Sequence, residues 1–257
     1  MSLIHPTAII YPGAVIGEYC EIGPHCQIGP EVVLGCGNKL HSHVILMGEA
    51  HIGDGNQIFS YAVIGTDPQD LKYRGEKTGL SIGNRNVIRE FVTINRSNCS
   101  SELTSVGDGN LLMEYVHVGH NCQIGSGCVI ANTVQMAGHL VIEDYVSIGG
   151  LTAIHQFVHI GTHAFVGGAS AVKKDIPPYT RGMGNPYKTS GLNIVGLQRK
   201  GFSSESLDSI KEIYRVFYRQ GLNVSQALEI VESWPTLTPE QRIFLEFVRS
   251  SERGLSN

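Results

Sequence analysis

The sequence predicts a mainly β fold: a parallel β-helix of hexapeptide repeats, followed by a small α-helical domain. An aliphatic residue or Met recurs at every sixth position from Ile4 to Ile64, from Ile82 to Ile94 and from Val106 to Val172, always in the same phase and often with a Gly after it. A fixed short period of this kind indicates a chain that coils and stacks each coil on the one before. After the prolines at 177 and 178, the apolar spacing changes to that of amphipathic helices.

Two domains follow from this change, with residues 1–178 in the β-helix and 179–257 in a connecting segment and the C-terminal helices. The repeat loses its internal pattern near 65–81 and 95–105 but keeps its phase, so we expect excursions from the coil there. Two adjacent prolines end the repeat because proline has no N–H to donate to the next coil. The six-residue period does not determine the handedness of the coil.

The aliphatic position of each repeat should point inward, where each buried side chain contributes about 1.5–3 kcal/mol before conformational entropy is subtracted. Cys20, Cys26, Cys122 and Cys128 occupy a repeat position where small residues recur. We therefore expect them to pack as small apolar side chains rather than form disulfides or bind metal.

Three helices are predicted after the repeat. The first has its apolar face at Leu207, Ile210, Ile213, Tyr214, Phe217 and Tyr218, and Gly221 should end it. The second should start near Ser225. The third has Thr238 as N-cap, Pro239 in the first turn and Gln241 at the capping-box position. Its predicted apolar face is Ile243, Phe244, Phe247 and Val248.

Composition restricts the function. The net charge of −4 argues against a nucleic-acid surface. No apolar run is long enough to cross a bilayer, and the N-terminus lacks the layout of a signal peptide. We therefore expect a soluble, cytoplasmic protein without a transmembrane segment.

Polar residues stack at the coil spacing in the later repeats. With about 18 residues per coil, His120, Gly138 and Gln156 form one column, Asn121, His139 and Phe157 form the next, and His155 precedes Gln156. A histidine base beside a backbone N–H that can stabilise an oxyanion suits acyl transfer from a thioester to a hydroxyl. A lone surface histidine is usually only solvated, but three exposed positions in one column have no packing reason to be His, Gly and Gln.

The other histidines lack such partners: His5, His25, His41, His43 and His51 are interpreted as surface or subunit-contact residues, and His159 and His163 stay open.

Longer motifs make the assignment specific: HPTA at 5–8, QDLKY at 69–73, HVGHNC at 117–122, TAIHQF at 152–157, DIPPY at 175–179 and GLNIVGLQRKGF at 191–202. They resemble, over nearly the whole chain, the UDP-N-acetylglucosamine 3-O-acyltransferase family, which begins lipid A biosynthesis. The resemblance implies a left-handed β-helix and transfer of a (3-hydroxy)acyl chain from acyl carrier protein to UDP-N-acetylglucosamine. It implies a homotrimer with sites between subunits, and no cofactor or metal.

The resemblance also implies residue roles. His120 matches the catalytic base, and Gly138 matches the oxyanion donor. Gly168 matches the position that limits acyl length. The implied substrate-binding residues are Asp70, Lys72, His117, His139, His155, Gln156, Asn193, Arg199 and Lys200.

Three positions depart from the family pattern. Asn121 replaces an Asp, so a carboxylate next to the base is missing. Val195 replaces a Glu that contacts ribose in some members, and Lys200 replaces an Arg, which keeps the charge but loses the planar fork. Elsewhere, we expect a basic patch for the acidic carrier protein, formed by Arg74, Lys77, Arg85, Arg89 and Arg96.

Several alternatives stay open at this point. The acceptor could carry a 3-amine rather than a hydroxyl. The later N-acyltransferase of the same pathway should have an extra N-terminal domain, whereas the repeats here start at Ile4, and coenzyme A-dependent acetyltransferases of this fold usually lack the QDLKY and NIVGL segments. A carbonic-anhydrase-like metalloenzyme would use three histidines such as His117, His120 and His139. A non-catalytic scaffold is the simplest alternative.

Overall fold

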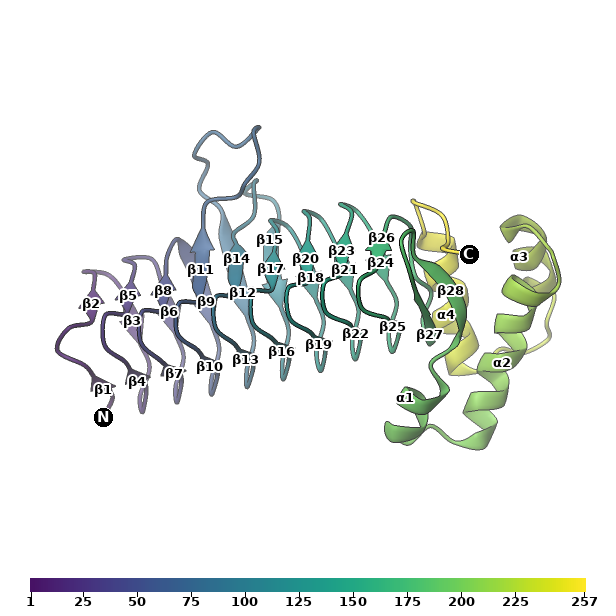
Figure 1. Cartoon of the computed structure of the whole chain (residues 1–257), viewed down its shortest axis with the longest axis horizontal. Coiled ribbons are helices and arrows are strands. Elements are labelled where there is room, and N and C mark those ends of the chain that lie inside the picture. The colour runs from purple at the N-terminus through teal and green to yellow at the C-terminus, as the bar shows by residue number, and fades with distance from the viewer.

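The computed structural model describes residues 1–257, and Figure 1 shows a long prism of stacked coils with helices at its C-terminal end. The coils contribute short strands to three sheets, which we call A, B and C, and these strands pair in parallel; sheet A ends in the antiparallel pair of β27 and β28. Sheet A contains β1 (Leu3–Ile4), β4 (Glu21–Ile22), β7 (Lys39–Leu40), β10 (Gln57–Ile58), β13 (Val87–Ile88), β16 (Leu111–Leu112), β19 (Val129–Ile130), β22 (Ser147–Ile148), β25 (Phe165–Val166), β27 (Thr180–Met183) and β28 (Lys188–Leu192).

Sheet B contains β2 (Ile9–Ile10), β5 (Gln27–Ile28), β8 (Ile45–Leu46), β11 (Val63–Thr66), β14 (Thr93–Asn95), β17 (His117–Val118), β20 (Gln135–Met136), β23 (Ala153–Ile154) and β26 (Ala171–Val172). Sheet C contains β3 (Val15–Ile16), β6 (Val33–Leu34), β9 (Glu49–Ile52), β12 (Gly79–Ile82), β15 (Leu103–Val106), β18 (Gln123–Ile124), β21 (Val141–Ile142) and β24 (His159–Ile160). The prism therefore has three edges, A–B, B–C and C–A, named for the sheets that the chain passes between. The predicted β-helix is confirmed.

The core lies inside the prism. The second residue of most two-residue strands is an aliphatic residue or Met that is fully buried, and these residues form one continuous apolar cluster. The first coil differs from the prediction, since Ile4 is 46% exposed and Ile10 and Ile16 are only partly buried. β1, β2 and β3 each pair on one side only, with β4, β5 and β6, so their inward side chains are covered on that side alone.

Asparagine side chains form a ladder inside the C–A edge, which the six-residue pattern did not reveal. The Oδ1 of Asn38 accepts from the Asn56 N–H (2.9 Å), that of Asn56 from Asn86 (2.8 Å), and that of Asn86 from Asn110 (2.9 Å). The four predicted inward cysteines are buried and free, and burial raises the pKa of Cys122 and Cys128 to about 12. They pack as small apolar residues, as predicted.

Two loops leave the prism at the B–C edge, the first over residues 67–78 and the second over residues 96–102. Figure 1 shows them projecting together from one side of the prism. Both predicted excursions are therefore present, but they are shorter than expected because Gly79 and Leu103 already pair in sheet C. Arg96 fixes the first loop, since its guanidinium donates to Gly65 O (3.0 Å) and the Tyr73 hydroxyl (2.9 Å).

The C-terminal region contains α1 (Ile194–Arg199), α2 (Ser204–Arg219), α3 (Val224–Glu232) and α4 (Pro239–Ser250). Thr238 caps α4 in a capping box with Gln241, as predicted. The segment predicted only as a connection instead contains the antiparallel β27–β28 pair and α1. Ile243 was placed on the apolar face of α4 but is 39% exposed, whereas Leu245 is buried. None of these helices combines the length and the apolar character that crossing a membrane requires.

Asp175 ties the last coil to the end of the chain. One carboxylate oxygen accepts from the His159 N–H (2.8 Å), and the other accepts from the Ser251 hydroxyl (2.6 Å). The Asp175 N–H also donates to Gly254 O. This buried carboxylate therefore holds the C-terminal segment against the final coil.

We expect substitutions at two adjacent residues of β19 to differ sharply in their effect on the free energy of unfolding. Ile130 is fully buried and Val129 is 39% exposed. We expect Ile130→Ala to lower the free energy of unfolding by about 2–5 kcal/mol, because it leaves a cavity between coils. Val129→Ala should cost less than about 1 kcal/mol. Denaturant unfolding of both variants measures this difference, and equal effects would contradict the inward assignment.

Candidate active site

The site centres on His120, in the turn between β17 and β18 at the B–C edge. Coil stacking places His139 and Gly138 directly on it, since the His139 N–H donates to His120 O at 2.9 Å. Asn121, His139 and Phe157 all have a positive φ (59°, 59° and 65°) and make the sharp turn at this edge in successive coils. The two predicted columns are therefore present.

Gly138 lies against the His120 ring. A Cβ at this position would be 2.5 Å from His120 Cε1 and 2.7 Å from Nε2, so any larger residue would push the imidazole away. The Gly138 N–H, which lies outside the strands, donates no backbone hydrogen bond. Glycine thus permits the close approach of the ring and leaves a free donor beside it.

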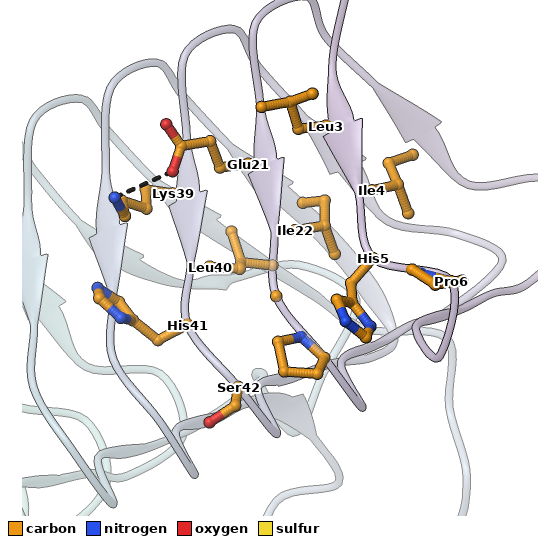
Figure 2. A pocket seen from close by; sticks show the side chains of 12 residues that line it. Leu3, Ile4, His5, Pro6, Glu21, Ile22, Lys39, Leu40, His41 and Ser42 are labelled. Carbon is orange, nitrogen blue, oxygen red and sulfur yellow. Dashed lines mark ion pairs between the residues drawn. The ribbon is translucent and has the colours of Figure 1, made fainter.

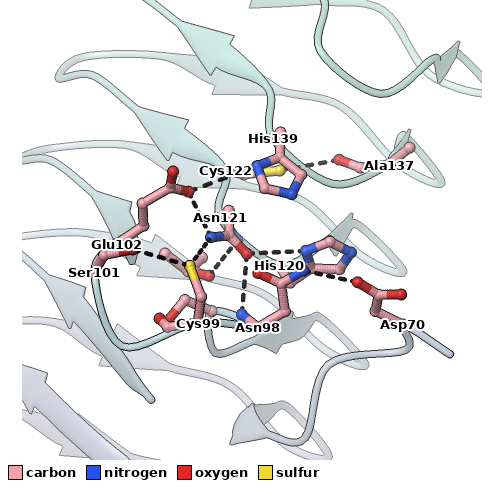
Figure 3. A network of polar contacts seen from close by, with 12 residues as sticks. Asp70, Asn98, Cys99, Ser101, Glu102, His120, Asn121, Cys122, Ala137 and His139 are labelled. Atoms are coloured by element: carbon pink, nitrogen blue, oxygen red, sulfur yellow. Dashed lines mark hydrogen bonds and ion pairs between the residues drawn. The ribbon is translucent and has the colours of Figure 1, made fainter. Parts of the chain in front are cut away.

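Hydrogen bonds determine which nitrogen of His120 carries the proton (Figure 3). The Asn98 N–H donates to Asn121 Oδ1 (3.0 Å), and Asn121 Nδ2 donates to Glu102 Oε2 (2.6 Å). The backbone N–H of Asn98 can only donate and the carboxylate of Glu102 can only accept, so the Asn121 amide has one possible orientation. Its Oδ1 lies 2.9 Å from His120 Nδ1, which must therefore be the N–H donor. In the neutral ring Nε2 is left unprotonated, as a general base requires.

Asp70 reaches the site from the first loop. Its carboxylate accepts from the Lys72 N–H (2.9 Å) and from Asn98 Nδ2 (2.7 Å) in the second loop. These bonds, led by that from Lys72, lower the pKa of Asp70, and the nearby His120 acts in the same direction. Asp70 is therefore an anion beside His120, while the Lys72 side chain is exposed to solvent.

Two other histidines adjoin His120. His117 Nδ1 lies 2.7 Å from the Thr93 hydroxyl, and burial lowers the pKa of His117, with a smaller effect from His120. His139 meets His120 edge to face and stacks on Phe157. Burial and His120 lower the pKa of His139, against a smaller opposing effect from Glu102. Both rings favour the neutral form next to the base.

Two hollows meet at His120. One, of about 420 Å³, lies over sheet B and is lined by His117, Gln135, Ala153 and Gln156 among others. The second, of about 510 Å³, lies under the first loop and is lined by Asp70, Lys72, His139 and Gln156 among others. Gln69 lines both hollows, and sequence reasoning missed it although it begins the QDLKY motif. His155 lines neither, and its Nδ1 lies 3.1 Å from Gln156 O.

The remaining predicted residues lie at other edges of the same chain. Asn193 caps α1 and donates to His163 O (3.0 Å), and Lys200 Nζ lies 4.4 Å from the Tyr145 ring centre, which places both at the C–A edge. Arg199 ends the same helix and is exposed. Gly168 lies at the A–B edge, between β25 and β26. One chain alone therefore does not bring these residues to His120.

The expected basic patch does not form. Arg85 lies at the C–A edge and Arg89 at the A–B edge, and Arg89 is paired with Glu90. Lys77 is paired with Glu31 and Glu49, and Arg96 is largely buried against Asp67. The five residues come from one stretch of sequence, but the coil distributes that stretch over all three edges.

A separate hollow of about 510 Å³ lies on sheet A near the N-terminus (Figure 2). It is lined by the exposed apolar side chains of Leu3 and Ile4 and by the Lys39–Glu21 ion pair (2.9 Å). It contains His5 and His41 but no pairing of a histidine with a free glycine N–H like that at His120. Within the chain, no three His, Cys, Asp or Glu side chains are placed to hold a metal ion.

Comparison with known proteins agrees with this geometry. The family model for bacterial transferase hexapeptide repeats matches residues 1–30 and 104–138, and the model "Udp N-acetylglucosamine O-acyltransferase; Domain 2" matches residues 175–256. The fold and these matches define a transferase of the hexapeptide-repeat class.

Solved structures identify the family within this class. UDP-N-acetylglucosamine acyltransferase from Bacteroides fragilis is 44% identical, with 99% of this chain and 100% of that chain covered and a TM-score of 0.95. The Francisella novicida enzyme is 40% identical (99% and 94% covered, TM-score 0.96), and the Arabidopsis enzyme is 36% identical (99% and 100% covered, TM-score 0.87). The chain belongs to the UDP-N-acetylglucosamine acyltransferase family.

Proposed function

We propose that this enzyme transfers a (3-hydroxy)acyl chain from acyl carrier protein to the 3-position of UDP-N-acetylglucosamine, in lipid A biosynthesis in the cytoplasm. The family supports the reaction and the acceptor. The observation that carries the mechanism is the 2.9 Å contact of His120 Nδ1 with Asn121 Oδ1, which leaves Nε2 as the base. The His120 ring also lies against Gly138, whose N–H donates no backbone hydrogen bond.

The chemistry then follows from these two groups. His120 Nε2 takes the proton of the sugar 3-hydroxyl as its oxygen attacks the thioester carbonyl. The Gly138 N–H donates to the oxyanion of the tetrahedral intermediate. The C–S bond then breaks, and the imidazolium returns the proton to the departing thiolate. A positioned base contributes about 10²–10⁴-fold, and one oxyanion donor about 10²–10³-fold.

The polar hollow under the first loop suits the sugar. Asp70, Lys72, His139 and Gln156 line it and offer both donors and acceptors. His117 lines the hollow over sheet B, which we assign to the acyl side. His155 lines neither hollow, so its side chain would have to move in order to contact the substrate. For the carrier protein, the first loop offers two exposed cations, Lys72, which lines the hollow under this loop, and Arg74.

A homotrimer would complete the site. If the A–B edges of three copies face a common axis, sheet B of one chain faces sheet A of the next. The B–C edge carrying His120 then meets the C–A edge that carries Arg199 and Lys200. Two cations there suit the diphosphate of a nucleotide sugar. Asn193 already caps α1 with its side chain, so it would contact the nucleotide only through its remaining hydrogen-bonding capacity.

The A–B edge has the character expected of a surface that faces the trimer axis. His25, His43, Tyr61, Phe91 and Tyr115 stack in one column there, with ring centres 4.9–5.1 Å apart. Tyr61, Phe91 and Tyr115 are each more than 40% exposed in the single chain. Exposed aromatic rings in a row are typical of subunit contacts.

Acyl transfer from 3-hydroxyacyl carrier proteins of several lengths to UDP-N-acetylglucosamine tests the function. We expect turnover with one preferred length and a loss of at least about 100-fold in kcat for His120→Ala, because the base is removed. Turnover only with the 3-amino sugar would change the acceptor and keep the mechanism. No turnover with either sugar, or full activity of His120→Ala, would contradict the proposal.

Acyl length gives a second test, at Gly168. This exposed glycine leaves open space at the A–B edge, and a Cβ there would closely approach only Gly150 O, at 3.1 Å. If the chain end lies here, Gly168→Met should shift the preferred acyl chain to a shorter one. The same panel of donors measures the shift, with Thr236→Met in the helical region as control. An unchanged length preference in Gly168→Met would remove Gly168 from the acyl site.

A further inference from the structure

We propose that Glu102 is a positioning residue for His120 and acts through the side-chain amide of Asn121. The three side chains form a continuous line in Figure 3, from the ring through the amide to the carboxylate. This inference rests on the proposed role of His120 as the base. It gives the site a carboxylate that is absent from position 121 itself.

The amide at the centre of the line is rigidly held. Asn121 is 3% exposed, and its backbone N–H donates to the Thr104 hydroxyl at 2.8 Å. Oδ1 accepts from Asn98 N–H on one side and faces His120 Nδ1 on the other. For Nδ2, the only acceptor besides Glu102 is the Cys99 sulfur at 3.6 Å, a weak partner. Glu102 therefore provides the strong acceptor that keeps the amide oxygen turned toward the ring.

The Glu102 carboxylate also stabilises the positive charge that His120 acquires during the reaction. When His120 takes the substrate proton on Nε2, the ring becomes a cation whose Nδ1–H still donates to the neutral amide. No proton passes through Asn121, because its carbonyl oxygen only accepts and its NH₂ only donates. Glu102 is the nearest negative charge along this line, so it stabilises the imidazolium that forms as the sugar oxygen attacks.

Other charges near His120 limit the size of this effect. Asp70 supplies a second negative charge from the first loop, and Lys72 an opposing positive one. His117 on the same coil and His139 on the next both lie close, and His139 Nδ1 is 3.6 Å from Glu102 Oε2. The Glu102 side chain is 49% exposed, so water screens it in part. We therefore expect a moderate contribution rather than an all-or-none one.

Glu102→Gln tests the charge with little change of shape, because the amide oxygen still accepts from Asn121. We expect kcat to fall about 5–20-fold with KM within about twofold, less than removal of the base itself. The pH at which His120 is half protonated, followed by NMR of its ring, should fall, because loss of a nearby negative charge disfavours the cation. The pH dependence of kcat should move in the same direction. Glu18→Gln, at an exposed carboxylate in the N-terminal coils, is the control.

Rescue separates positioning from mere structural support. Asn121→Asp combined with Glu102→Gln places a carboxylate directly on His120 Nδ1, and we expect it to restore both kcat and the titration midpoint. A Glu102→Gln variant with wild-type kcat and an unchanged His120 titration would overturn the proposal. A loss of kcat without any change in the titration, and without rescue, would also overturn it. The NMR titration does not depend on turnover, so inactivity of the wild type would refute the proposed function and still leave this inference testable.

Discussion

Backbone hydrogen bonds between successive coils are the constraint on which the rest of this structure depends. Each coil pairs in parallel with the next, as in the register His117↔Gln135↔Ala153, and this register fixes which side chains are neighbours. Any one-residue slip would turn the inward aliphatic side chains outward. The buried asparagine ladder adds side-chain bonds that favour the same register along the C–A edge.

The register also makes each edge a separate chemical surface. Stacked aromatic rings occupy the A–B edge, and Tyr145 and His163 stack at the C–A edge beneath Lys200. Only the B–C edge lets the chain leave the prism, and its two loops bring Asp70, Asn98 and Glu102 to His120. The rigid coils thus place the base and the oxyanion donor, while the loops supply the charged groups around them.

Much of this arrangement is predictable from the sequence because it is periodic. The spacing of one coil places Gly138 on His120 and Gln156 in the same column without further information. The period cannot describe what interrupts it: the β27–β28 pair, the contacts of the two loops, and the salt bridges of Arg96 and Lys77 depend on three-dimensional neighbours. The exposure of Ile4 has a similar cause, since a repeat pattern does not reveal that the first coil lacks a neighbour.

Asn121 and Glu102 illustrate the same limit. From the sequence alone, Asn121 indicates only that a carboxylate is missing next to the base. The sequence does not connect Asn121 with Glu102, because the two residues lie in different segments with no shared period. In the folded chain the second loop returns to the B–C edge, and the Asn121 amide bonds to Glu102 at 2.6 Å. A departure from a family pattern can therefore be compensated by a residue that only the fold brings into contact.

We propose that His120 of one chain works with Arg199 and Lys200 of another chain in a trimer. Mixed trimers test it directly: His120→Ala chains and Arg199→Ala/Lys200→Ala chains, each weakly active alone, are combined in equal amounts under conditions that exchange subunits. Random assortment should restore about a quarter of wild-type activity, since one site in about four then receives both intact edges. No recovery in trimers shown to be mixed would mean that each site is built within a single chain, and would contradict the account.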